Sequence, residues 1–84
     1  MEFSPDSEPL PLLDRFYPYA TIEQGWAIEK LMRSGFYSFS RYMLNEDNHK
    51  AVAVLESSHD VVIVYPDGYK DLRPDKTVEV VRDF

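Results

Sequence analysis

The chain has 84 residues, which is enough for a single domain over residues 1–84 and too few for two separate cores. It contains no cysteine, so disulfides and thiolate zinc sites are not available to stabilise it. Fifteen acidic and nine basic side chains give a net charge of −6, which disfavours general nucleic-acid binding because that depends on Lys and Arg neutralising phosphates. No apolar run approaches the roughly 18 residues of a membrane span, and the first residues lack the basic flank of a signal peptide. We therefore expect a cytoplasmic protein without a membrane partner.

The amino-terminal region is rich in proline and in acidic side chains. Four of the six prolines fall within residues 1–19, and residues 1–14 contain four acidic side chains but no basic one. Proline fixes φ and removes a backbone donor, so we expect an extended or polyproline II-like arm, with residues 1–9 as a flexible acidic part. The leucines and aromatic residues of 10–19 are too apolar to prefer water. This stretch is expected to cover the edge of the core, and docking on a partner is the alternative.

One helix is predicted, over residues 21–34. Thr21 and Gln24 have the spacing of a capping box, in which each side chain satisfies a free backbone donor at the helix start. Gly35 marks the end, because glycine readily enters the left-handed region. Gly25 costs roughly 1 kcal/mol relative to alanine inside a helix, so we expect it to allow close backbone packing. The apolar face, with Trp26 as its largest buried anchor, is expected to contain Ile22, Trp26, Ile28, Leu31 and Met32.

The remainder of the chain favours β-strands joined by short polar turns, with no second helix. Five strand segments are predicted: residues 36–44, 50–56, 60–65, 69–73 and 77–82. The sequence Tyr65-Pro66-Asp67-Gly68 has the form of a β-turn, which predicts a hairpin. Connections this short require antiparallel pairing. The predicted fold class is α+β: a Pro-rich extended arm, one helix, and a four- to five-stranded antiparallel meander. The sheet is expected either to lie open beneath the helix or to bend into a barrel-like form.

Aromatic residues recur in the first predicted strand. Strict alternation places Tyr37, Phe39, Arg41 and Met43 on one face of this strand and Tyr42 on the other. The aromatic spacing partly follows the strand by which RNA-recognition domains stack bases, but the glycine and basic positions of that motif are not matched. We therefore expect Tyr37 and Phe39 to pack beneath the helix or the amino-terminal arm.

No residue pattern predicts catalysis. Ser58-His59-Asp60 contains the residue types of a catalytic triad, but consecutive residues do not converge on one point, so we interpret it as a polar turn. His49 follows acidic residues without the spacing of a metal site, and the three glycines are too far apart for a phosphate-binding loop. We predict a protein that is not an enzyme and has no cofactor and no metal site.

The number of aromatic side chains indicates a function in binding. Five Phe, six Tyr and one Trp are more than a small core can hide, and Tyr and Trp are favoured at interfaces. We predict a small non-enzymatic interaction or regulatory module whose partner is another protein. The candidate partner-binding residues are Phe16, Tyr17, Tyr19, Tyr37, Phe39, Arg41 and Tyr42.

Two other functions and one assembly stay open. An acidic inhibitor that binds the basic surface of a nucleic-acid-binding protein would need a continuous acidic stripe on the folded body, not acidity confined to residues 1–14. A binder of single-stranded nucleic acid would need a basic groove beside Tyr37, Phe39 and Tyr42. A homodimer could form through the edge of the predicted strand 77–82.

Overall fold

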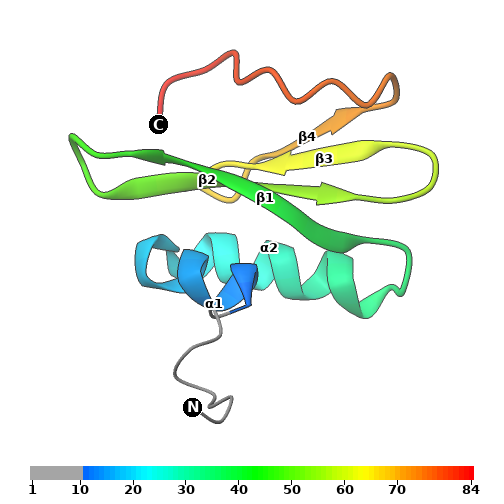
Figure 1. Ribbon diagram of the computed structural model, residues 1–84, viewed down its shortest axis with the longest axis horizontal. Coiled ribbons are helices and arrows are strands. Elements are labelled where there is room, and N and C mark those ends of the chain that lie inside the picture. Colours follow the sequence, from blue (N-terminus) through cyan, green and yellow to red (C-terminus); the bar gives the residue numbers. More distant parts are fainter. Residues whose placement is uncertain (1–10) are drawn as a thin grey trace, which may run out of the picture.

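The computed structural model describes residues 11–84 and shows an α+β fold with helices on one face of an antiparallel sheet (Figure 1). The helical elements are α1 (Leu12–Phe16), the 3₁₀ turn η2 (Tyr17–Tyr19) and α2 (Ile22–Arg33). The strands are β1 (Ser38–Asn45), β2 (Lys50–Glu56), β3 (Val61–Val64) and β4 (Lys70–Arg73). They pair in sequence order into one open four-stranded sheet, so the fold class is confirmed and the barrel-like alternative is wrong.

The amino-terminal stretch is helical where an extended conformation was predicted. Pro11 is the N-cap of α1 and Pro18 lies in the first turn of η2, where a missing backbone N–H costs nothing. The two prolines therefore start helical turns instead of preventing them. Phe16 is fully buried, so this stretch covers the core as predicted. The expected flexible arm of residues 1–9 lies outside the described residues.

Helix α2 begins at the predicted capping box, but the side that it packs on the sheet differs from the predicted one. Its capping box is present, with Thr21 Oγ1 accepting from the Gln24 backbone N–H at 3.0 Å and Gln24 Oε1 accepting from the Thr21 N–H at 3.3 Å. Gly35 has a φ of 84°, as a left-handed helix terminator should. Trp26, however, is 70% exposed, so its prediction as a buried anchor is wrong. No other part of the described chain lies within 4 Å of the position that a Cβ on Gly25 would take, so close packing at Gly25 within the chain is also wrong.

A β-bulge in β1 changes the faces that strict alternation predicts. The pairing of β1 with β2 shifts between Phe39 and Arg41, which leaves Ser40 as an extra residue. Beyond the bulge Tyr42 pairs with Ala53 and returns to the helix-covered face, where Phe39 also lies. Arg41 turns to the opposite face instead. The assignment of Tyr42 to the other face from Phe39 is therefore wrong.

Two apolar clusters lie on opposite faces of the sheet. The first is between the helices and the sheet and includes Phe16, Ile28 and Leu55. The second, on the far face, is built from buried residues of β2 and β3 together with Tyr65. Because both faces are covered, every residue of β3 is buried. The central strand therefore needs the continuous apolar sequence that predicted it.

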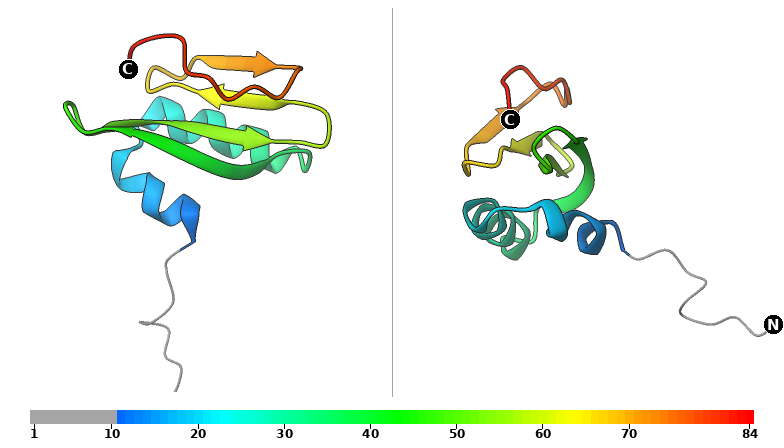
Figure 2. Two further views of the ribbon diagram at one scale, coloured as in Figure 1. Left: turned by 45° about the horizontal axis from the view of Figure 1, so that its top comes forward. Right: turned by 90° about the vertical axis from the view of Figure 1, so that its left-hand side faces the viewer.

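The far face is covered by the C-terminal segment, residues 74–84, which runs back across the sheet without joining it (Figures 1 and 2). Val78, Val80 and Phe84 pack against the second cluster. The prediction of a strand over 77–82 is therefore wrong, and so is the sheet edge on which the predicted homodimer depended. Val78 and Val80 alternate with exposed neighbours as in a strand, but their side rests on the face of the sheet.

Arg82 holds this segment in place. Its guanidinium lies 4.9 Å from the centroid of the Tyr65 ring and 4.6 Å from that of Tyr69. It also forms an ion pair of 3.0 Å with Asp67 in the turn between β3 and β4. That turn has the predicted form, with the Gly68 N–H donating to the Tyr65 carbonyl at 2.8 Å. The β-turn at residues 65–68 thus anchors the C-terminal segment through the ion pair of Asp67 with Arg82.

Candidate functional site on helix α2

Four of the predicted partner-binding residues form an internal cluster. Phe16 is fully buried, and its ring centroid lies 5.3 Å from that of Phe39 and 5.7 Å from that of Tyr42. The ring centroid of Tyr19 lies 6.2 Å from that of Tyr42. All four aromatic residues belong to the first apolar cluster or pack against it. Such tilted ring pairs stabilise a core. The cluster explains why the chain needs these aromatic residues without assigning them to a partner.

The three remaining predicted residues do not lie together. Tyr17 is 41% exposed on the helical layer, whereas Arg41 is exposed on the opposite face of the sheet. Tyr37 is half-buried and packs against the first cluster. Since Tyr37, Phe39 and Tyr42 all pack on a helix-covered core, they provide no open platform on which bases could stack.

The Ser-His-Asp turn is organised around Asp60. Tyr37 Oη donates to Asp60 Oδ1 at 2.7 Å, and Ser57 Oγ donates to the same oxygen at 2.8 Å. These bonds, that of Tyr37 first, hold the pKa of Asp60 below its usual value, and the bond to Asp60 raises the pKa of Tyr37. His59 is exposed and donates its backbone N–H to Ser57 Oγ. The residues therefore tie a turn to the end of the sheet, as the polar-turn interpretation predicts.

His49 takes part in packing. It has a positive φ of 59°, and its ring lies 4.6 Å from that of Tyr19. Within residues 11–84 no three His, Cys, Asp or Glu side chains gather in a group that could hold a metal ion.

A cavity of about 260 Å³ opens beside the end of the C-terminal segment. Its walls include Lys50 and Arg82 but also Asp67 and Asp83. Because the lining has two basic and two acidic side chains, and Arg82 is already paired with Asp67, the cavity does not present charge of a single sign to a ligand. Its volume is also below the roughly 300 Å³ at which small-molecule sites begin. The candidate site lies elsewhere.

Helix α2 carries two large apolar side chains on the side that faces away from the sheet. Trp26 is 70% exposed and Ile22, one turn earlier, is 68% exposed. We call these two residues the exposed pair. Gln24 and Ile28, which face the sheet, are fully buried on the other side of the helix. Figure 2 shows the sheet lying along one side of α2.

Gln24 explains why a tryptophan is outside and a polar residue inside. Its Nε2 donates to the carbonyl of Ala51 at 2.6 Å and to that of Val64 at 3.0 Å. The β2–β3 ladder ends at the pairing of Ala53 with Val64, so the amide bridges the two strands where their own ladder stops. A polar side chain can occupy the core when all its bonds are satisfied. Hydropathy alone does not reveal this, although the role of Gln24 in the capping box marks its position.

Charged side chains lie near the exposed pair at both ends of α2. Glu23 lies in the first turn of α2, and Lys30 and Arg33 lie in the last, as the helix dipole favours. Arg33 also pairs with Glu29 at 2.9 Å across one exposed turn. The first turn of the helix thus carries an acid and the last turn carries bases, while Glu29, on the same side as Ile22, is paired with Arg33.

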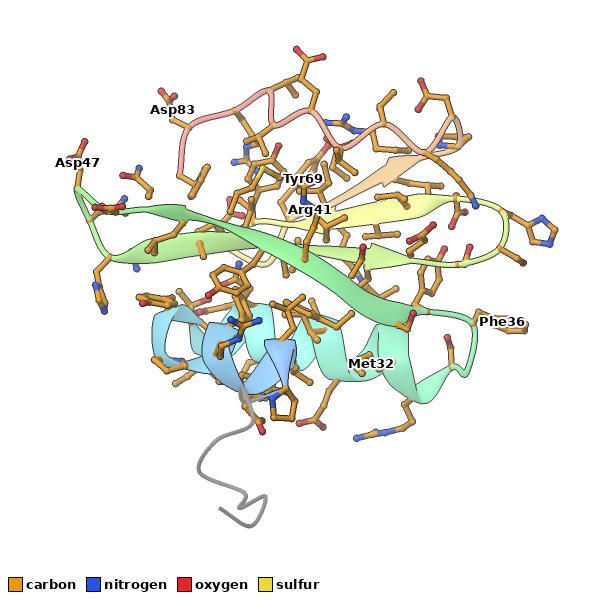
Figure 3. All side chains as sticks on the ribbon, viewed as in Figure 1. Met32, Phe36, Arg41, Asp47, Tyr69 and Asp83 are labelled. Atoms are coloured by element: carbon orange, nitrogen blue, oxygen red, sulfur yellow. The ribbon has the colours of Figure 1, made fainter. Side chains whose placement is uncertain are left out.

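Other exposed apolar side chains are carried singly by different parts of the chain. Phe36 is 76% exposed and projects from the connection between α2 and β1 (Figure 3). Leu72 on β4 and Val81 in the C-terminal segment are 54% and 66% exposed. Single exposed apolar residues are ordinary on protein surfaces, whereas two on one turn of a rigid helix form a patch.

No family model matches this sequence, and comparisons with curated proteins and with solved structures gave no match. None of the helices in residues 11–84 has the length and apolar character needed to cross a membrane. The exposed pair on α2 is therefore the candidate site.

Proposed function

We propose that this protein is a small, non-enzymatic interaction module that binds another protein through the exposed pair on α2. The supporting observation is the 70% exposure of Trp26, with Ile22 beside it. Tryptophan is the residue type most enriched among the few side chains that dominate binding energies. Gln24 explains why Trp26 faces outward, but residues 11–84 leave most of its side chain uncovered.

The mode of binding that suits this surface is a helix laid in a groove. One or two large anchors on one helical face enter apolar pockets of the partner, and charged neighbours set the orientation. Helix α2 is held on the sheet by Gln24 and its cap, so it loses little conformational freedom on binding. Truncation of such an anchor typically costs 2 kcal/mol or more, or about 30-fold in affinity.

The test is affinity capture from native cells with the wild-type chain and two variants. Trp26→Ala should lose the captured proteins, whereas Phe36→Ala, which removes an equally exposed aromatic ring away from α2, should retain them. Both positions are exposed, so circular dichroism should show that both variants fold. An identical set of proteins captured by all three chains would refute the role of the exposed pair.

A second salt concentration in the same experiment tests the acidic inhibitor. Ion pairs of 2.9 Å between Glu29 and Arg33 and of 2.7 Å between Asp71 and Arg73 place bases among the acids of the folded body. This alternation does not favour an acidic stripe. Capture through the exposed pair should persist at high salt, whereas capture by an acidic mimic should be lost because salt screens exposed charges.

A further inference from the structure

We infer that the partner seated on the exposed pair is a second copy of this chain, with the two α2 helices packed antiparallel across a twofold axis. This inference rests on the proposed function and names its partner. It is carried by three features of α2: the exposed pair, the glycine beside it, and the order of charges along the helix.

Gly25 is the first independent feature. It lies inside α2, near the end of the first turn, where glycine costs roughly 1 kcal/mol relative to alanine. No other part of the described chain comes within 4 Å of where its Cβ would be, so packing within one copy gives no reason for it. A bare backbone at this point would allow a second helix to approach closely.

The positions of Gly25 and Trp26 fit a twofold arrangement. Successive helical residues are separated by about 100°, so Gly25 and Trp26 lie on opposite flanks of the direction in which Ile22 points. In an antiparallel twofold pair, each flank of one helix lies beside the same flank of the other. An axis near residues 25 and 26 therefore brings two bare backbones together on one flank and two indole rings together on the other. A single register of the two helices therefore accounts for both Gly25 and Trp26.

The charges select the antiparallel orientation. Glu23 and Lys30 are seven residues apart, so they lie on one flank of α2, two turns from each other. Antiparallel packing about the same axis brings Glu23 of each copy to Lys30 of the other. Parallel packing about a twofold axis would instead put this flank of the two copies on opposite sides of the pair, so Glu23 and Lys30 would not meet. The graded charge of α2 is thus complementary to itself.

The dimer is expected to be weak. One helix from each copy buries less than the roughly 1,200 Å² of a stable interface, so association should depend strongly on concentration. Trp26 is the one tryptophan of the chain, so its fluorescence reports directly on this contact.

The experiment follows the full chain from about 10 µM to about 1 mM by sedimentation equilibrium and tryptophan emission. The mass should rise from 9.8 kDa toward twice that value, while the emission shifts to shorter wavelength. Gly25→Leu should keep the helix but remove both changes, because the side chain separates the backbones. Phe36→Ala should behave as the wild type. A wild-type mass of 9.8 kDa at every concentration, or undiminished association of Gly25→Leu, would overturn the inference.

Charge exchange tests the orientation. Glu23→Lys and Lys30→Glu should each weaken association, and the double variant should restore it, because both cross-pairs are then rebuilt with reversed sign. Failure of the double variant to recover would contradict antiparallel packing.

The outcome is separable from that of the proposed function. A chain that stays monomeric but captures other proteins in a Trp26-dependent way would overturn the second-copy inference and support the proposed function. A monomeric chain with no Trp26-dependent capture would overturn both.

Discussion

Two glycines in or next to α2 have equal space around them and opposite conformational needs. Neither Gly25 nor Gly35 has another part of the described chain within 4 Å of where a Cβ would lie. Gly25 is helical, whereas Gly35 has a φ of 84°, in the left-handed region. A methyl group at either position meets no steric clash, so the backbone alone decides its effect.

We predict that Gly25→Ala raises the free energy of unfolding by about 0.5–1 kcal/mol, because alanine is the better helix former. Gly35→Ala should lower it by about 1 kcal/mol, since alanine is strained at positive φ. Urea unfolding at low micromolar concentration, where self-association does not contribute, measures both. Changes of the same sign would show that backbone conformation does not control these sites.

The hydrogen bond from Tyr37 to Asp60 links the protonation of this carboxyl to stability in acid. Its pKa is depressed in the folded state, chiefly by the bond from Tyr37 and then by that from Ser57. A depressed carboxyl pKa adds stability above the unfolded value, near pH 4, and this stability is lost as the pH falls through the folded pKa.

Tyr37→Phe should therefore raise the pKa of Asp60 and move the acid-unfolding midpoint to higher pH. An NMR titration of the Asp60 carboxyl measures the first effect and circular dichroism against pH measures the second. Tyr17→Phe, at an exposed tyrosine, is the matched control. An unchanged Asp60 titration in Tyr37→Phe would contradict the assigned cause.

Elements defined by local signals could be predicted from the sequence. The capping residues of α2, the apolar run of β3 and the Pro-Asp-Gly turn each depend on neighbours within a few positions. Long-range choices could not be predicted. Ser40 forms a bulge that is visible only when β1 is paired with β2, and residues 77–82 have a strand-like pattern but lie across the sheet.

The candidate site was missed for a related reason. An apolar pattern does not indicate which of two sides of a helix meets the sheet, because a satisfied polar residue can take the inner position. In α2 the inner position is occupied by Gln24, and Trp26 lies on the outer side. The aromatic excess correctly suggested more rings than the core hides, yet Trp26, the exposed ring of the candidate site, is not one of the seven predicted residues.

Gln24 should be among the costliest positions of α2 to change. Gln24→Leu would leave the buried carbonyls of Ala51 and Val64 without their donor, lowering the free energy of unfolding by about 1–3 kcal/mol. Gln24→Glu should also lose stability, because a carboxylate cannot donate. Guanidinium unfolding gives both values, with Glu29→Gln at an exposed site of the same helix as control. A neutral Gln24→Leu would show that helix and sheet do not depend on this bridge.

At the largest scale, residues 11–84 form three layers: helices, sheet and the C-terminal segment (Figure 2). The outer layers differ in how they are held. The helices bury an apolar face with regular hydrogen bonding, whereas the C-terminal segment depends on a few side chains, with Arg82 at its centre. We expect this segment to open more readily than the rest of the fold.

Arg82→Gln should loosen the segment without unfolding the domain. The amide of Val81, which donates to Tyr65 Oη at 3.4 Å, should exchange with solvent roughly five- to tenfold faster for a loss of about 1 kcal/mol. Hydrogen-exchange NMR measures this, with the amides of β2 as internal reference. Arg33→Gln, which breaks an ion pair on α2, should leave Val81 unchanged. Equal Val81 rates in both variants would assign the anchoring to another residue.

The C-terminal segment also sets the order in which the two apolar clusters can form during translation. During translation the helices and the first three strands leave the ribosome before residues 78–84, and they contain all that the first cluster needs. The second cluster stays uncovered until Phe84 has emerged and its carbonyl can accept from Asn45 Nδ2, a bond of 2.6 Å. Until this segment has emerged, a nascent chain therefore has one sheet face covered and the other exposed, which is when a chaperone that binds valine-rich strands would meet it.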